Sequence, residues 1–167
     1  MKNIKNYGTF ALNETDLDSP LHPMEQKLTL TGAIERSMRT KAPILFIAGK
    51  PAAEAAQAAD DLRATLIPID AEFMRPEDFG IPAIGGGYGP PSFLPYGSSK
   101  DPMILLIYDL NRANRQVLRA AKKLASVRGL GEYTLPENCT IVLSFSSPDE
   151  AETYMGLRMD NFITVQP

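Results

Sequence analysis

The stretch ILFIAGKPAAEAAQAADDL, residues 44–62, decides the fold class of this 167-residue chain. Its first five residues are continuously apolar, which is typical of a short strand buried on both faces of a parallel sheet. Gly49, Lys50 and Pro51 predict a turn, and the Ala-rich segment 52–64 has very high helix propensity. A buried strand, a tight turn and a helix in this order are the setting in which many phosphate-binding loops occur.

Helices and strands alternate on both sides of this stretch. Apolar residues at near-helical spacing predict helices at 24–40 and 111–127, and Pro148 begins a third, short helix at 148–154. Apolar runs predict strands at 65–70, 103–108 and 161–165, and a hairpin with arms 131–136 and 140–146. The alternation predicts an α/β fold, a three-layer sandwich of a mainly parallel sheet flanked by helices, with a β-hairpin insertion.

The length and composition predict one globular domain at 24–167, preceded by a polar arm at 1–23. The net charge of −3 gives no overall attraction to nucleic acid or to an anionic membrane. No segment has the apolar length of a signal peptide or a membrane span, so we expect a cytoplasmic protein that does not bind membranes. One cysteine, Cys139, excludes an internal disulfide, and with a single histidine, His22, no ordinary zinc site is expected.

Three segments resemble the MoxR-like AAA+ ATPases, which have a P-loop NTPase fold. LTGAIERSMRTKAPILFIAG (30–49) is similar to the helix and strand that lead into the family's phosphate loop. MRPEDFGIP (74–82) is similar to its P-E-D-x-x-G segment. DLNRANRQVLRAAKKLASVRGLGEYTLPENCTIVLSFSSPDE (109–150) resembles the part between its second acidic motif and its first sensor. The likeness covers residues 25 to 165, and it implies an AAA+ core.

The residues that would bind nucleotide do not match the family. Counting from Gly49, the position of the phosphate-binding Lys falls on Ala55 and that of the Mg²⁺-binding Ser or Thr on Ala56, while Glu54 would repel phosphates. Lys50 lies in the turn but out of place, either as a remnant or as a solvated lysine. We therefore predict a phosphate loop whose chemistry is lost, with no cofactor and no metal, ATP and Mg²⁺ being disfavoured.

The acidic motif and the sensors differ as well. Tyr108 takes the place of the Mg²⁺-binding Asp, and Asp109 is either a displaced acid or a carboxylate stabilised at the start of the next helix. The resemblance places the first sensor at Ser147 and an arginine that reaches a neighbouring subunit at Arg158. The family's helical lid has no counterpart before Pro167, so we expect a domain without a lid.

Two further features are candidate interaction surfaces. The predicted helix 111–128 carries six cations and no acid, which indicates either a solvated face or a docking surface for an acidic partner or nucleic acid. The Gly/Pro-rich loop 80–99 carries aromatic residues that suit either a protein interface or packing over the sheet edge. The residues are Arg112, Arg115, Arg119, Lys122, Lys123 and Arg128 on the helix, and Tyr88, Phe93 and Tyr96 in the loop.

These observations favour a degenerate, non-catalytic AAA+-like protein, a pseudo-ATPase that serves as an interaction, adaptor or assembly subunit. The resemblance implies ring assemblies, remodelling activity and partners with von Willebrand factor A domains, and short degraded versions are at home in phages and mobile elements. We expect a protein partner or self-association. Two alternatives stay open: a weak ATP- or ADP-binding module, with hydrolysis only beside a partner subunit of a MoxR-type complex, and a nucleic-acid-binding protein that uses the basic helix.

Overall fold

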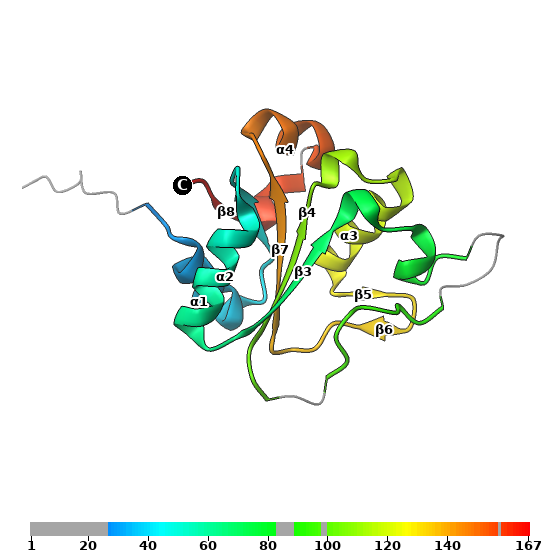
Figure 1. Cartoon of the computed structure of the whole chain (residues 1–167), viewed down its shortest axis with the longest axis horizontal. Coiled ribbons are helices and arrows are strands. Elements are labelled where there is room, and N and C mark those ends of the chain that lie inside the picture. Colours follow the sequence, from blue (N-terminus) through cyan, green and yellow to red (C-terminus); the bar gives the residue numbers. More distant parts are fainter. Residues whose placement is uncertain (1–26, 83–88, 98–99, 157) are drawn as a thin grey trace, which may run out of the picture.

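The computed structural model describes residues 27–82, 89–97, 100–156 and 158–167. These residues build a five-stranded sheet in the order β3-β4-β7-β2-β8, and every neighbouring pair is parallel (Figure 1). The strands are β2 Ile44–Ile47, β3 Thr65–Asp70, β4 Met103–Tyr108, β7 Cys139–Phe145 and β8 Ile163–Val165. The predicted parallel α/β sheet is therefore confirmed.

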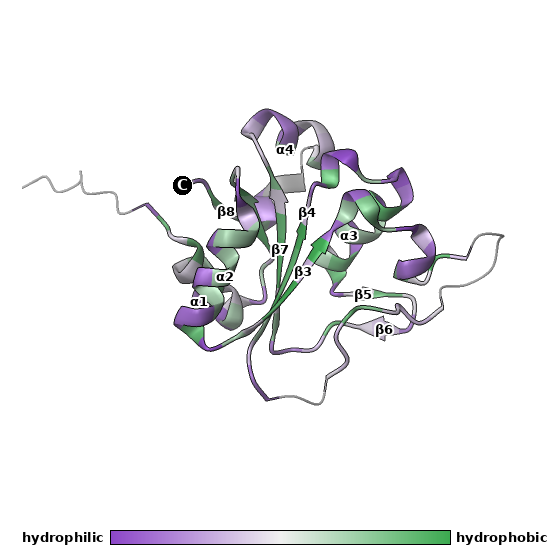
Figure 2. Cartoon of the chain, in the orientation of Figure 1, coloured by the Kyte–Doolittle hydropathy of each residue, from purple (hydrophilic) through white to green (hydrophobic). Residues whose placement is uncertain are grey.

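The position of each strand in the sheet follows from its side chains. All residues of β2 and β7 are buried, as expected for continuous apolar runs in the centre of a parallel sheet. In β3, Pro68 is exposed and the strand lies at the edge, where a residue without an N–H is tolerated. Figure 2 shows the hydrophobic colouring concentrated in β3, β4 and β7.

Helices cover both faces of the sheet (Figure 1), and the sheet separates the hydrophobic core into two clusters. On one face, α1 (Leu30–Thr40) and α2 (Pro51–Leu62) pack against strand residues such as Ile104 and Leu106. On the other face, α3 (Arg115–Val127) and α4 (Pro148–Met155) pack against the alternate residues, including Leu105 and Ile107. This alternation is what the period of two in a strand requires.

Two predicted helices begin later than expected, because a side chain caps each one. Thr29 is extended and its Oγ1 accepts a hydrogen bond from Gly32 N at 3.0 Å, so α1 begins at Leu30 and residues 27–29 are not helical. Asn114 caps α3 in the same way, accepting from Gln116 N at 2.7 Å. The segment before it forms a separate 3₁₀ turn, η4 (Leu110–Arg112), with Ala113 extended.

The predicted hairpin pairing is wrong. A hairpin does exist, but it joins β5 (Gly129–Leu130) to β6 (Tyr133–Thr134) through a two-residue turn. The segment 140–146 belongs instead to β7, which pairs with β4 and β2. Its continuous apolar run is buried between two neighbours, whereas a hairpin arm with one open face would show alternation.

The C-terminal segment also differs from its predicted bounds. The last strand begins at Ile163 rather than at Asn161, because η5 (Arg158–Asn161) forms a 3₁₀ turn first. Among the helices built from described residues, none has the length and apolar character needed to cross a membrane.

Candidate functional site

The connection between β2 and α2 occupies the place of a phosphate loop. Ala48 still bonds β7, with its N–H donating to Phe145 O at 3.0 Å, and α2 begins at Pro51. Only Gly49 and Lys50 remain as a turn, and residues 51–56 are already helical. A phosphate loop needs several non-helical residues whose N–H groups wrap around the phosphates. The two-residue connection before α2 has no such stretch.

The early start of α2 also decides where its side chains point. Ala55, at the position of the phosphate-binding Lys, is completely buried against the sheet, and Ala56 is exposed. Glu54 is exposed in the first turn, and its N–H reaches Lys50 O at 3.5 Å. Pro51 has no N–H to offer. The first turn therefore presents few donors and one carboxylate to any anion.

Neither turn residue, Gly49 or Lys50, is held in the special backbone conformation or the close contacts that a phosphate loop requires. A Cβ added at Gly49 would meet no heavy atom within 4 Å, so neither space nor backbone conformation requires glycine there. Lys50 is exposed and caps α2 without a side-chain hydrogen bond. Of its two interpretations, the geometry agrees with a solvated lysine.

Acidic side chains gather at the carboxyl ends of β3 and β4. Asp70, Glu72 and Asp109 each offer a carboxylate oxygen within 4.8 Å of the others. Asp70 accepts from Glu72 N at 3.1 Å, and Glu72 accepts from Arg112 Nη1 at 3.3 Å. Carboxylate oxygens are ligands for hard cations, but exposed acidic groups also gather without one.

Of the two interpretations of Asp109, a carboxylate stabilised at the start of the next helix finds no support in the geometry. The backbone of Asp109 is in the left-handed region, with φ 55°, and its side chain makes no capping hydrogen bond to η4. Loss of water around it and the nearby Asp70 carboxylate raise the pKa of Asp109. Burial and the Asp70 and Asp109 carboxylates also raise the pKa of Tyr108. Asp70 and Glu72 were missed in the sequence because they come from the end of β3 and the following turn η2 (Ala71–Phe73), far from Asp109 in the chain.

The predicted first sensor serves as a helix cap. Ser147 Oγ accepts a hydrogen bond from Glu150 N at 3.2 Å and so begins α4. Glu150 in turn accepts from both Ser146 N and Ser146 Oγ, and from Asn111 Nδ2 at 3.0 Å. The Asn111–Glu150 bond links η4 to α4, and Ser147 uses its oxygen as the cap of α4. Arg158 lies in η5, and its side chain is outside the described part of the structure.

The six predicted basic residues do not form one surface. Arg112 precedes α3 and pairs with Glu72, and Arg128 donates to Pro136 O at 2.7 Å and Cys139 O at 2.9 Å. Arg128 thus links the end of α3 to residues 136–139, whereas Arg112 and Glu72 form a surface ion pair. Arg115, Arg119, Lys122 and Lys123 remain on the outer side of α3.

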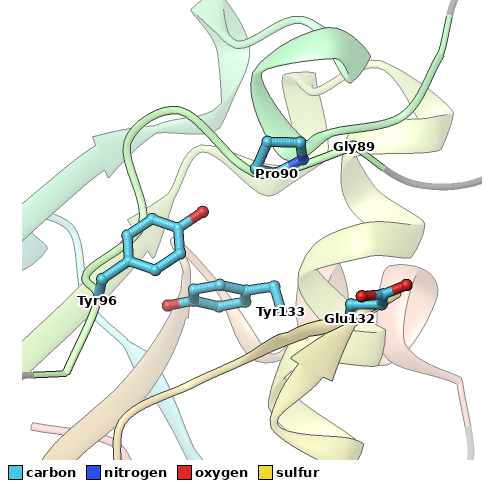
Figure 3. Close-up of a pocket in the computed structure, with 5 residues that line it drawn as sticks. All are labelled: Gly89, Pro90, Tyr96, Glu132 and Tyr133. Atoms are coloured by element: carbon cyan, nitrogen blue, oxygen red, sulfur yellow. The ribbon is translucent and has the colours of Figure 1, made fainter.

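The Gly/Pro-rich loop packs over the small hairpin. Its Tyr96 ring meets Tyr133 edge-on at 5.2 Å, beside a pocket of about 290 Å³ that Gly89, Pro90 and Glu132 complete (Figure 3). Both hydroxyls are occupied, since Tyr96 Oη donates to Pro91 O at 2.9 Å and Tyr133 Oη to Pro95 O at 2.5 Å. Phe93 packs on Phe79 at 4.9 Å. The packing interpretation holds for Phe93, whereas Tyr96 is 58% exposed. Tyr88 lies outside the described residues.

The single thiol is not a candidate nucleophile. Cys139 is buried at the start of β7, and burial raises its pKa to about 11. The reactive thiolate form is therefore scarce at neutral pH.

Comparison with known proteins supports the fold. No protein-family model matches the chain, and no curated protein matches it. Two solved mutant forms of Thermotoga maritima RuvB match at a TM-score of 0.50 and 14% identity, over 80% and 83% of this chain. A structure of Drosophila ORC bound to AT-rich DNA and Cdc6 has a TM-score of 0.47 and 10% identity over 80% of this chain and 50% of that one, which adds nothing to the argument.

These matches concern the architecture alone. The chain spans less than half of the RuvB chains, at 42% and 43% of their length. The parallel sheet flanked by helices is the AAA+ P-loop type of fold. At this level of identity, the activity of the neighbours does not transfer to this chain.

Proposed function

We propose that this chain is a non-catalytic AAA+-like protein that acts by binding a protein partner. The observation that carries the proposal is the start of α2 at Pro51, which leaves two residues where a phosphate loop needs many. The missing Lys at Ala55 and the missing Mg²⁺ acid at Tyr108 support the same conclusion. Charge-assisted contacts to phosphate are among the strongest that side chains make, and the two-residue turn has one cation, Lys50, in place of that set.

Within this proposal, the closer relation is to MoxR-like proteins, with an AAA+-like core at 24–167 in an adaptor or assembly role. Two motifs of the resemblance lie at structural junctions that fix the fold. Asn111, Arg112 and Ala113 form the connection from β4 to α3, and residues 131–136 contain the hairpin turn and β6.

Calorimetric titration with Mg-ATP and with ADP up to millimolar concentration tests the proposal, together with a phosphate-release assay on the same sample. We expect no saturable heat and no turnover, while an active AAA+ ATPase titrated in parallel gives both. Saturable ATP binding that Lys50→Ala abolishes would contradict the proposal and locate a rebuilt site at the β2–α2 turn. Hydrolysis by the chain alone would contradict it outright.

A further inference from the structure

A large cavity lies beside α3, away from the β2–α2 turn. Its volume is about 970 Å³, at the upper end of the range of small-ligand pockets. Three elements contribute its walls: the outer side of α3, the end of α4 with the segment before β8, and the segment before β2. The described lining residues are Ala42, Pro43, Arg119, Lys122, Lys123, Ser126, Met155, Gly156, Asn161 and Phe162.

One wall of this cavity is cationic. Arg119, Lys122 and Lys123 come from α3 at spacings of three and four residues, so their side chains lie on neighbouring turns. Lys122 Nζ donates to Tyr154 O at 2.8 Å, which holds the ammonium at the rim and leaves it two further donors. No Asp or Glu is among the described lining residues. Anions therefore meet a wall of one sign, although the chain carries a net charge of −3.

Other lining residues are apolar. Met155 is 3% exposed and Phe162 is half-buried, and both pack with the core that α3 covers. Pro43 is a further apolar lining residue, and Asn161 adds a polar amide. A ligand that matches this lining therefore combines negative charge with an apolar group.

We propose that this cavity binds an acidic peptide segment of a partner protein, with an apolar side chain seated against Met155 and Phe162 and carboxylates on the α3 cations. Arg119 and Lys122 suit carboxylates of such a peptide. Proteins that bind duplex DNA can make about six to ten phosphate contacts, more than the described cations of this lining supply. Carboxylate–cation pairs would give specificity, and the apolar contact would add affinity.

This inference rests on the proposed partner-binding function, since it names the chemistry of the partner. The probe is a fluorescein-labelled peptide of sequence Asp-Asp-Leu-Asp-Asp-Leu, titrated with the full chain and followed by fluorescence anisotropy. We expect saturable binding. Replacing the Asp residues by Asn, or the Leu residues by Ser, should each weaken binding by about tenfold or more, because each removes one half of the recognition.

Two charge reversals on the same helix separate the cavity from general electrostatics. Arg119→Glu places a carboxylate in the cavity wall and should raise the Kd of the peptide at least about tenfold. Arg115→Glu changes the net charge equally on the same helix but does not line the cavity, and it should change the Kd by less than about threefold. Both side chains are exposed, so far-UV circular dichroism of the two variants should match the parent.

Four results overturn the inference: absence of saturable peptide binding, equal effects of the two reversals, insensitivity to loss of the peptide's Leu residues, and preference for a labelled oligonucleotide that Arg119→Glu abolishes. The last result would assign the cavity to nucleic acid. None of these four outcomes is evidence for ATP binding or hydrolysis. The inference can therefore fail while the proposed function stands. Saturable Mg-ATP binding in the calorimetric titration that Arg119→Glu abolishes would overturn both.

Discussion

Two strand-to-helix units, β2–α2 and β4–α3, build opposite faces of the same sheet. In β2–α2 the helix begins after two turn residues, and its buried residues are all alanines: Ala55, Ala58 and Ala59. In β4–α3 the connection runs from Asp109 to Asn114, and the helix buries Val117 and Leu124 as well as alanines. A helix that buries only methyl groups can lie closer to a sheet than one that buries Val and Leu.

The difference shows where polar chemistry can exist in this fold. The connection before α2 has two residues, which is too short for a phosphate loop. The longer connection before α3 holds Asp109 near Asp70, together with the Asn111–Glu150 bond. Binding chemistry is thus expected on the α3 side of the sheet, and the following variants probe the two units.

The largest effect is expected in α3. Leu124 is completely buried between the helix and the sheet, so Leu124→Ala should lower the free energy of unfolding by about 2–5 kcal/mol. Urea denaturation followed by circular dichroism measures it. Ser126→Ala, at an exposed position of the same helix, should change stability by less than about 0.5 kcal/mol. A cost for Leu124→Ala below about 1 kcal/mol would mean that α3 is loosely packed.

Enlarging a side chain tests the close packing of α2. Ala58 is 1% exposed, and Ala58→Leu should lower the free energy of unfolding by about 1–3 kcal/mol because the helix has no space for the added carbons. Ala56→Leu makes the same change on the exposed side of α2 and should be close to neutral. If Ala58→Leu stabilises the chain in the same urea titration, α2 does not lie close to the sheet and the comparison fails.

A smaller effect, with a defined pH dependence, is expected at Asp109. Because its pKa is raised in the folded state, the ionised carboxylate destabilises the fold above that pKa, and the penalty disappears below the pKa of the unfolded chain. Asp109→Asn should therefore increase stability at pH 7, by less than about 1 kcal/mol at this partly exposed site. Asn also tolerates the left-handed backbone.

Denaturation midpoints of Asp109→Asn and the parent chain, measured between pH 3 and pH 8, should converge as the pH falls. A gain that stays constant across this range would come from the backbone preference of Asn alone. A loss of stability at pH 7 would show that the carboxylate has a favourable partner, and would remove the argument for electrostatic repulsion.

The smallest effect is expected at the β2–α2 turn. Gly49→Ala should leave stability unchanged or raise it by up to about 1 kcal/mol, since the backbone conformation suits any residue and the unfolded chain loses freedom. Gly80→Ala is the contrasting variant. There φ is +80° and an added Cβ would lie 2.2 Å from Gly89 O, so thermal unfolding should occur at a clearly lower temperature. Strong destabilisation by Gly49→Ala would mean that the turn does need glycine.

Much of the fold could be predicted from the sequence because burial leaves a local pattern. The apolar runs at 44–48 and 103–108 became central strands, and Pro68 placed its strand at an edge. The segment 140–146 was read as a hairpin arm because an apolar run says nothing of its neighbours in the sheet. The start of α3 was missed because Asn111 and Asn114 are both possible caps, and only the bond to Gln116 distinguishes them.

The candidate sites depended more on tertiary contacts. The absence of a phosphate-binding Lys and Ser or Thr at Ala55 and Ala56 was visible in the sequence, but the start of α2 at Pro51 was not. The acidic group of Asp70, Glu72 and Asp109 joins two strands that lie far apart in the chain. The basic series on 111–128 was visible in the sequence. Only the structure shows that Arg112 bonds Glu72 and that Arg128 bonds Pro136 O, whereas other cations of the series line the cavity.

Pro68 has a consequence for how this molecule behaves at high concentration. In a parallel strand, alternate residues direct their N–H and C=O groups to the same side, so the bonds of β3 to β4 leave the N–H of Leu66, the nitrogen of Pro68 and the N–H of Asp70 facing outward. The missing proton interrupts this row at its middle. A strand from another molecule cannot form a continuous ladder of hydrogen bonds there. Pro68 thus disfavours edge-to-edge aggregation.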